Sequence, residues 1–147
     1  MKNEGWWFKE INQEWRTLMN EVKENSSAMT VIWIPKLGER LQTAHEQLEK
    51  VQAGLNQYLE SKRSKFPRFY FLSNDELLEI LSETKEPLKV QPHLKKCFEG
   101  INELDFDAEK KIHGMYSSEK ENIPFTAIID PVQARGNVEE WLVKVEE

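Results

Sequence analysis

Apolar residues recur every three or four positions over residues 6–23, which is the spacing of one face of an α-helix. The stripe consists of Trp7, Ile11, Trp15, Leu18 and Val22. Asn25, Ser26 and Ser27 end the pattern, because such side chains compete with a helix for backbone hydrogen bonds. We therefore expect a first amphipathic helix over residues 6–23, with its tryptophans in the core.

A second periodic segment follows Pro35, a residue that fits the first turn of a helix. Its apolar or semi-apolar positions alternate in steps of four and three, and they are Leu37, Leu41, Ala44, Leu48, Val51, Leu55 and Tyr58. A helix of about 26 residues, from Pro35 to roughly Glu60, is about 39 Å long at 1.5 Å per residue. The Leu37–Tyr58 seam has two interpretations: the inside of an ordinary helical bundle, or a coiled-coil surface through which a stand-alone scaffold dimerises.

A basic and aromatic stretch over residues 62–72 separates the long helix from the next one. Pro67 ends the long helix. The run Phe69-Tyr70-Phe71 shows no alternation of polarity, so we expect a short, buried, extended segment there. Ser73 and Glu76 then have the spacing of a capping box, which predicts the start of a new helix.

The C-terminal part of the sequence mixes helices and strands. Pro92 begins a short helix, and strand-like runs on both sides of a polar turn predict a β-hairpin over residues 111–129. Pro124 implies an edge position for the returning strand. Asn137, with Glu140 three residues later, predicts the cap of a last helix.

Together these elements predict a mainly α fold, an elongated helical bundle with one β-hairpin inserted before the C-terminal helix. We expect a two-helix part over residues 1–66 and a helix–hairpin–helix part over residues 67–147. The last helix is only about ten residues long at Glu147 and lacks a capping residue, and the first helix begins almost at Met1. Such ends are typical of a piece of a longer chain, and a natural terminal helix that frays is the alternative.

Composition narrows the range of functions. Of the 147 residues, 39% are hydrophobic and 31% charged, which indicates one folded, highly charged unit. The net charge of −6 argues against a general nucleic-acid binder, and the longest apolar run, residues 31–34, is too short to span a membrane. The N-terminus has no apolar signal segment. The single cysteine permits no internal disulfide, so a reducing compartment is the default.

The sequence offers little for catalysis. The six glycines are isolated, so no phosphate-binding loop is recognisable, and the three histidines lack the spacing of a zinc hydrolase. His93 and Cys97 can meet on one helix face as a base and a nucleophile. No orienting acid accompanies them, however, and a buried cysteine is usually a small hydrophobe. We therefore expect no catalytic, cofactor-binding or metal-binding residue in this chain.

The cations and aromatic residues of 62–72 give a further hypothesis, a platform for single-stranded nucleic acid. The negative net charge and the adjacent capped helix favour a buried aromatic core instead. In that interpretation the cations form a solvated rim, and they are Lys62, Arg63, Lys65 and Arg68. We expect neither nucleic acid nor membrane among the partners.

Several stretches, taken in order along the chain, resemble the linker of dynein heavy chains, also described as N-terminal region 2. They are residues 55–63, 66–81, 90–101, 117–121 and 136–142. The residues at the centre of the likeness are Phe66, Pro67, Arg68, Phe69, Tyr70, Phe71, Ser73 and Glu76. The likeness covers residues 35–147 strongly and 1–34 more loosely. The residues of the matching segments are more similar to those of axonemal, inner-arm dyneins than to those of cytoplasmic ones.

The resemblance implies a mechanical role. In that family the linker lies across a ring of AAA+ modules, and it bends and straightens with the ATP cycle to deliver the power stroke. ATP and Mg belong to other parts of the heavy chain, so the resemblance implies a non-catalytic segment of a motor ATPase. Its implied partner is the AAA+ ring of the same chain, with other dynein subunits and microtubules engaged only through the parent. The implied location is the cytoskeleton of the cytoplasm, in the axoneme of a cilium or flagellum.

The resemblance also implies that a hairpin of the linker touches the ring when the linker bends. In this sequence the corresponding tip residues are Glu119, Lys120 and Glu121.

Overall fold

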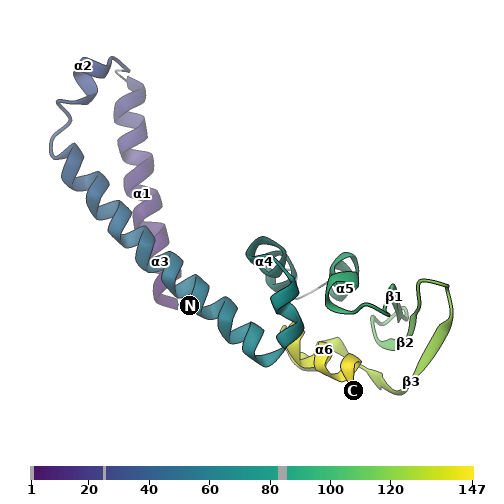
Figure 1. The fold of residues 1–147 in the computed structure, drawn as a ribbon. Coiled ribbons are helices and arrows are strands. Elements are labelled where there is room, and N and C mark those ends of the chain that lie inside the picture. The colour runs from purple at the N-terminus through teal and green to yellow at the C-terminus, as the bar shows by residue number, and fades with distance from the viewer. Residues whose placement is uncertain (1, 25, 83–85) are drawn as a thin grey trace. The chain divides into compact units, whose positions relative to one another are not determined.

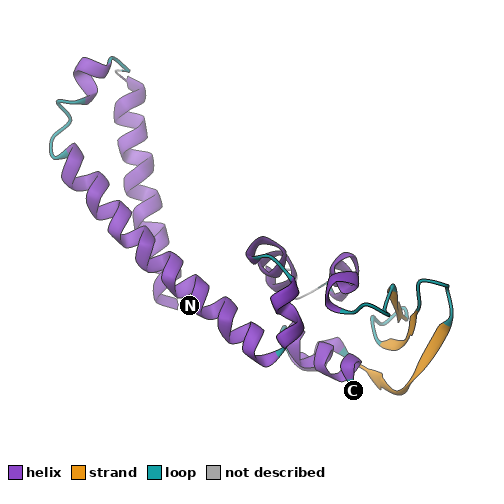
Figure 2. Ribbon diagram, in the orientation of Figure 1, coloured by secondary structure: helices purple, strands orange, loops and turns teal. Residues whose placement is uncertain are grey.

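The computed structural model describes residues 2–24, 26–82 and 86–147, and consists of helices with three strands near the C-terminus (Figures 1 and 2). The chain forms two compact units, Met1–Tyr58 and Leu59–Glu147. The mainly α fold with a hairpin before the last helix is confirmed, whereas the division at residue 66 stays a prediction. Asn25, part of the expected helix break, lies outside the described residues.

The first unit is a pair of antiparallel helices. Helices α1 (Lys2–Glu24) and α3 (Leu37–Lys65) run side by side, and the short α2 (Ala28–Val31) lies in their connection (Figure 1). Helix α3 begins later than Pro35 because Lys36 adopts a left-handed backbone conformation with φ of 56°. It continues beyond Glu60, to the residue before Phe66.

The apolar stripe of α1 is only partly buried. Ile11 and Leu18 are buried, but Trp15 is 49% exposed and Trp7 is half-buried. The expectation of a core position is therefore wrong for Trp15. A single neighbouring helix covers a narrow seam, whereas the full stripe of α1 needs more than one neighbour.

Polar contacts fix the pairing of α1 with α3. The Arg40 Nε donates to Glu14 Oε1 at 2.5 Å, and its Nη1 donates to Glu21 Oε2 at 3.2 Å. Gly54 lies close to α1, because a Cβ atom added to it would be 2.8 Å from Glu4 Cγ. Arg40 and Gly54 thus mark the line on α3 along which α1 packs.

The second unit contains the last turns of α3 and, within its described residues, six further helical segments and a sheet. In chain order the helical segments are η1 (Pro67–Phe71), α4 (Asn74–Ser82), η2 (Pro87–Val90), α5 (Gln91–Cys97), η3 (Pro131–Ala134) and α6 (Val138–Glu146). None of the helices in the described parts of the chain is both long enough and apolar enough to cross a bilayer.

The core of the second unit centres on Phe66 and Phe69, which have no exposed surface. Their ring centroids lie 4.9 Å apart in an edge-to-face arrangement. The expected buried, extended segment at 69–71 is wrong, because this run lies in the 3₁₀ helix η1 and both Tyr70 and Phe71 are exposed. A 3₁₀ helix has three residues per turn, so only one residue in three faces the core.

The two helix caps behave differently. The capping box is confirmed, because the Glu76 N–H donates to Ser73 Oγ at 3.3 Å and the Ser73 N–H donates to Glu76 Oε2 at 2.9 Å. Asn137 occupies the N-cap position of α6 as predicted, but the expected hydrogen bond from a helix amide to its side chain is wrong. Its Oδ1 accepts from Lys62 Nζ at 3.3 Å and its Nδ2 donates to Glu140 Oε1 at 2.8 Å, so neither group reaches a helix amide.

The sheet is antiparallel, with the order β1 (Glu103–Phe106), β2 (Ile112–Tyr116) and β3 (Asn122–Ile129). Strands β2 and β3 confirm the predicted hairpin, with β3 at the edge. Gly114 pairs with Pro124 and Ile112 with Ile129, so β3 advances five residues where β2 advances two. Residues 125–128 therefore bulge out of the ladder.

Candidate functional site

The tip of the β2–β3 hairpin is a turn organised by Ser117. Its N–H donates to the Glu121 carbonyl at 3.0 Å, and its Oγ accepts from the N–H groups of Glu119 at 3.2 Å and Glu121 at 3.1 Å. Lys120 has φ of 65° and donates its N–H to the Ser117 carbonyl at 3.1 Å. These backbone groups of the turn thus form their hydrogen bonds within the turn itself. The side chains of Glu119, Lys120 and Glu121 are all exposed.

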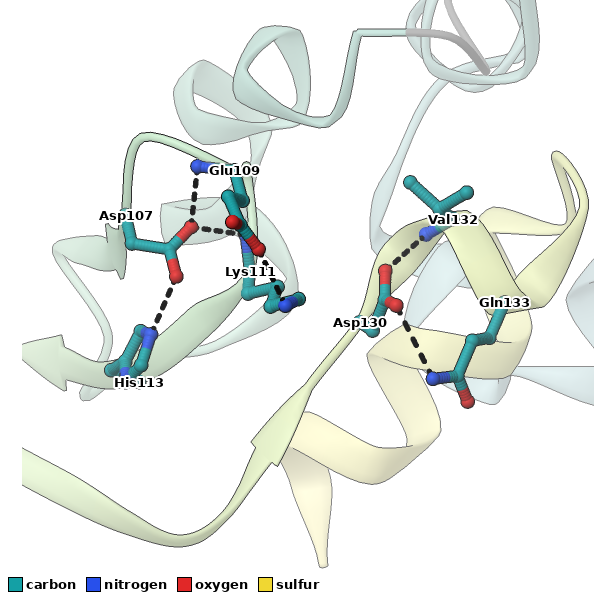
Figure 3. A network of polar contacts seen from close by, with 7 residues as sticks. All are labelled: Asp107, Glu109, Lys111, His113, Asp130, Val132 and Gln133. Atoms are coloured by element: carbon teal, nitrogen blue, oxygen red, sulfur yellow. Dashed lines mark hydrogen bonds and ion pairs between the residues drawn. The ribbon is translucent and has the colours of Figure 1, made fainter.

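The base of the hairpin is held by Asp107, in the connection between β1 and β2 (Figure 3). Its Oδ1 accepts from the N–H groups of Glu109 at 2.8 Å and Lys111 at 2.9 Å, and its Oδ2 is 2.8 Å from His113 Nε2. The hydrogen bond with His113, followed by that from the Lys111 amide, lowers the pKa of Asp107. Asp107 therefore ties the connection to the start of β2.

A second aspartate lies where β3 ends. Asp130 Oδ1 accepts from the Val132 N–H at 2.9 Å, and Oδ2 accepts from Gln133 Nε2 at 3.2 Å (Figure 3). These bonds cap η3, the segment that leads from the sheet to α6. The hairpin is thus anchored by an aspartate at each end of its base.

Arg68 connects three elements of the second unit. Its Nε donates to Glu146 Oε1 at 2.9 Å on α6, and its Nη1 donates to the Cys97 carbonyl at 3.1 Å on α5. The guanidinium also lies 4.9 Å from the centroid of the Phe98 ring, and that centroid is 5.8 Å from the centroid of Phe66. Arg68 therefore packs against one side of the aromatic core.

The residues at the centre of the sequence likeness divide into three groups. Phe66, Arg68 and Phe69 meet around the core of the second unit. Ser73 and Glu76 form the capping box of α4. The remaining members are exposed on η1, and they are Pro67, Tyr70 and Phe71.

Two cations expected in a solvated rim are buried instead, and Lys62 is one of them. Its Nζ donates to Glu139 Oε1 at 2.6 Å, and Glu139 is only 1% exposed. Burial raises the pKa of Glu139, but the hydrogen bond from Lys62, a backbone hydrogen bond and the charge of Lys62 together outweigh it, so that the pKa lies below its ordinary value. The first turn of a helix favours a carboxylate as well.

Arg63 is the other buried cation. Its Nη2 donates to the Leu72 carbonyl at 3.2 Å and to Asn74 Oδ1 at 2.8 Å, and its Nη1 donates to Glu60 Oε1 at 2.9 Å. Arg63 thereby joins the end of α3 to the start of α4. Sequence reasoning missed both cations, and the one available signal was an acidic residue, Glu139, among the apolar positions of the last helix.

The pair His93 and Cys97 gives little support to nucleophilic chemistry. Burial raises the pKa of the Cys97 thiol to about 11, so little thiolate is present at neutral pH. His93 Nε2 lies 3.5 Å from Glu79 Oε2. Within the described ranges, no group of three or more His, Cys, Asp and Glu side chains is arranged to hold a metal ion.

Comparison with known proteins gives a consistent result. All of residues 1–147 match the family model described as dynein heavy chain, N-terminal region 2. The chain is 54% identical over 147 residues to dynein axonemal heavy chain 3 of Mus musculus, in a match that covers 100% of this chain and 4% of that protein. It is 50% identical to dynein axonemal heavy chain 12 of Mus musculus, over 100% of this chain and 5% of that protein.

A third relative is more distant. Dynein axonemal heavy chain 1 of Mus musculus is 46% identical over 139 residues, which cover 95% of this chain and 3% of that protein. The chain thus spans 3% to 5% of the length of these relatives. With the family model matched from end to end, the chain belongs to the dynein heavy chain family, as an N-terminal region 2 of the axonemal type.

Proposed function

We propose that this chain is a non-catalytic linker segment of an axonemal, inner-arm dynein motor. It acts as a lever that bends over the AAA+ ring of the same heavy chain during the ATP cycle and so produces the power stroke. The match of all 147 residues to N-terminal region 2 carries this proposal. ATP and Mg are then bound elsewhere in the parent chain, which also engages microtubules and other dynein subunits in the axoneme of a cilium or flagellum.

The construction of α3 supports a load-bearing role. The helix has 29 residues, which corresponds to about 44 Å at 1.5 Å per residue, and contains no proline. Arg40 ties it to α1, and Arg63 ties its end to Leu72 and Asn74. A lever transmits force only when its helices resist bending, and an unbroken hydrogen-bond ladder with lateral contacts provides that resistance.

The test is to break α3 in a full-length heavy chain. Gln52 is exposed near the middle of the helix, and Gln52→Pro removes a backbone hydrogen bond at a cost of about 3 kcal/mol. We expect microtubule gliding to slow several-fold while ATP turnover without microtubules is retained. Gln52→Ala is the matched control and should leave gliding unchanged. Normal gliding by the proline variant would contradict the lever.

We also propose that Glu119, Lys120 and Glu121 contact the AAA+ ring. The support is that their side chains are exposed on a turn whose shape is fixed by Ser117. Within the described residues, none of the three side chains forms a hydrogen bond or an ion pair. The tip can therefore present its charges to another surface without first breaking contacts of its own.

Reversing the three tip charges tests this contact. Glu119→Lys, Lys120→Glu and Glu121→Lys together should slow gliding by the full-length motor. Glu99→Lys is the control, because Glu99 is exposed in the same unit and the substitution changes the net charge by the same amount. Unchanged gliding in the triple variant would contradict the proposed contact with the ring. It would not bear on the proposed lever function, which the Gln52 variants test separately.

A second candidate function is a stand-alone scaffold that dimerises through the Leu37–Tyr58 seam. One observation favours it: Leu41 and Leu48 are 40% and 42% exposed. The other seam residues are half-buried, in the unit where α1 packs along α3. Sedimentation of the 147-residue chain separates the candidates, because a monomer at all concentrations contradicts the scaffold and a dimer lost in Leu48→Glu supports it.

A further inference from the structure

Helix α1 carries a second apolar row that is not covered by α3. Phe8, Trp15 and Met19 are 53%, 49% and 37% exposed, although each is a large apolar side chain. With Asn12 they are spaced by four, three and four residues, which is the spacing of a heptad seam. Large apolar residues in such a regular row indicate a surface built for another helix.

Leu41 and Leu48 of α3 extend this row across the helix pair. The contact lines between the two helices are Ile11–Leu18 on α1 and Arg40–Gly54 on α3. Successive residues of a helix are about 100° apart around its axis. On each helix the exposed row therefore lies roughly 70–110° around the axis from the contact line, and the direction of this rotation is the same on both helices. Because the two helices are antiparallel, similar offsets place both rows on one face. We call this set the exposed stripe, and its members are Phe8, Trp15, Met19, Leu41 and Leu48.

A row of cations borders the exposed stripe on the side away from α3. Lys9, Arg16 and Lys23 are spaced by seven residues and are all exposed. We call them the basic flank. In the part of the chain that the structure describes, none of the three forms an ion pair. A hollow of ≈ 420 Å³ lies where stripe and flank meet, and it is lined by Asn12, Trp15, Arg16, Met19 and Asn20.

The charge of the flank selects the kind of partner. In a coiled coil, the residues beside the apolar seam determine partner choice by pairing with opposite charges on the next helix. A helix that lies on the exposed stripe places one of its own flanks beside Lys9, Arg16 and Lys23. A second copy of this chain, docked antiparallel and stripe to stripe through α1, would bring two basic flanks together, which is unfavourable.

We propose that the exposed stripe of α1 and α3 binds an acidic amphipathic α-helix from outside residues 1–147, which completes a three-helix bundle. The apolar side of that helix covers Phe8, Trp15 and Met19, and its carboxylates pair with the basic flank. This surface is distinct from the hairpin tip proposed to touch the AAA+ ring, and it does not depend on the lever.

The test uses the 147-residue chain and two synthetic helical peptides with fluorescent labels. Both have leucine at the seam positions, but one has glutamate and the other lysine on its flanks. Fluorescence anisotropy should show binding of the glutamate peptide and at least about tenfold weaker binding of the lysine peptide, the change that three surface ion pairs of ordinary strength produce together. Reversing the flank (Lys9→Glu, Arg16→Glu and Lys23→Glu) should reverse this preference.

Two single variants locate the binding surface. Trp15→Glu should abolish binding of the glutamate peptide, while Trp33→Glu, at an exposed tryptophan outside the stripe, should not change it. Circular dichroism shows whether the variants retain their helix content. Equal binding of both peptides, binding that is insensitive to Trp15→Glu, or failure of the flank reversal to change the preference would overturn the proposal. If the wild-type chain self-associates and the Trp15→Glu variant does not, the exposed stripe binds a second copy of the chain, and the proposal is overturned.

Discussion

At the scale of single residues, Glu76 combines a local and a long-range role. It accepts hydrogen bonds from the Ser73 amide and hydroxyl at the start of α4, and it pairs with Lys96 of α5. The hydrogen bond from Lys96 is the main cause that lowers the pKa of Glu76 from 4.5 to about 2, and the bonds from Ser73 add to it.

This pKa predicts how stability changes in acid. Because the carboxyl of Glu76 is more acidic in the folded chain than in the unfolded chain, its stabilisation is complete above pH 4.5 and is lost as the pH falls towards 2. Urea unfolding at a series of pH values measures the effect. The Glu76→Gln variant should lose less stability than the wild type across this window, and an identical pH dependence would contradict the assignment.

Gly114 on β2 illustrates a different constraint, the close approach of two strands. A Cβ atom added there would lie 2.6 Å from the Ile123 carbonyl oxygen and 3.1 Å from the Pro124 Cα. Both neighbours belong to the backbone and cannot rotate away. A side chain at this position must therefore push β3 away from β2.

We expect Gly114→Ala to lower the free energy of unfolding by about 1–3 kcal/mol, the usual cost of overpacking. Gly100→Ala is the matched control, since Gly100 lies in the same unit and an added Cβ meets nothing within 4 Å. Chemical unfolding of both variants measures the difference. Equal stabilities would show that the strands can move apart without cost.

At the scale of elements, the buried pair Lys62 and Glu139 joins the end of α3 to the start of α6. Oε2 of Glu139 is buried and has no hydrogen-bond partner within the described residues, so this carboxylate depends on Oε1, which Lys62 and Lys65 contact at 2.6 and 3.4 Å. Removing Lys62 leaves a buried charge with a weaker partner. Buried charge pairs are costly when only one member is removed.

The Lys62→Met variant should therefore be destabilised by about 3 kcal/mol, and the double variant Lys62→Met with Glu139→Leu should recover much of that loss. Unfolding free energies of the two single variants and the double variant form a double-mutant cycle. Additive losses in the cycle would show that the two side chains do not interact.

These elements also show what the sequence can predict. The capping box at Ser73 and Glu76 is determined within four residues, and the periodicity of α1 and α3 is a local property. Both features could therefore be predicted from the sequence. The burial of Lys62 depends on Glu139, 77 residues away, and no local pattern contains that information. Polarity alone cannot distinguish the 3₁₀ helix η1 from an extended segment, because both are short and both carry aromatic residues.

At the scale of the whole molecule, the turn at the hairpin tip was predictable because Ser117–Glu121 is a contiguous polar segment between two strand-like runs. The exposed stripe could not be predicted from the sequence in this way. The periodicity of α1 shows that a broad side of the helix is apolar, but only the structure shows that Ile11 and Leu18 are buried while Trp15 is exposed. The number of neighbours around a helix is a property of the tertiary fold, and a helix sequence does not contain it.

Pro124 in the edge strand β3 should limit aggregation of the chain at high concentration. We expect Pro124→Val to increase aggregation, measured by light scattering, because valine restores a backbone N–H and favours a regular strand. Asn56→Val is the matched control, since Asn56 is exposed and lies in the helix α3 rather than in a strand. Equal scattering by the two variants would show that the proline does not protect the edge.

The irregular course of β3 thus has a consequence for solubility. A straight, apolar edge strand pairs readily with the edge of another copy and starts aggregation. Ile123 and Ile128 of β3 are exposed, yet Pro124 offers no N–H and residues 125–128 bend away from the ladder. The strand can therefore keep apolar side chains in contact with water without offering neighbouring copies of the chain a template for intermolecular β-sheet.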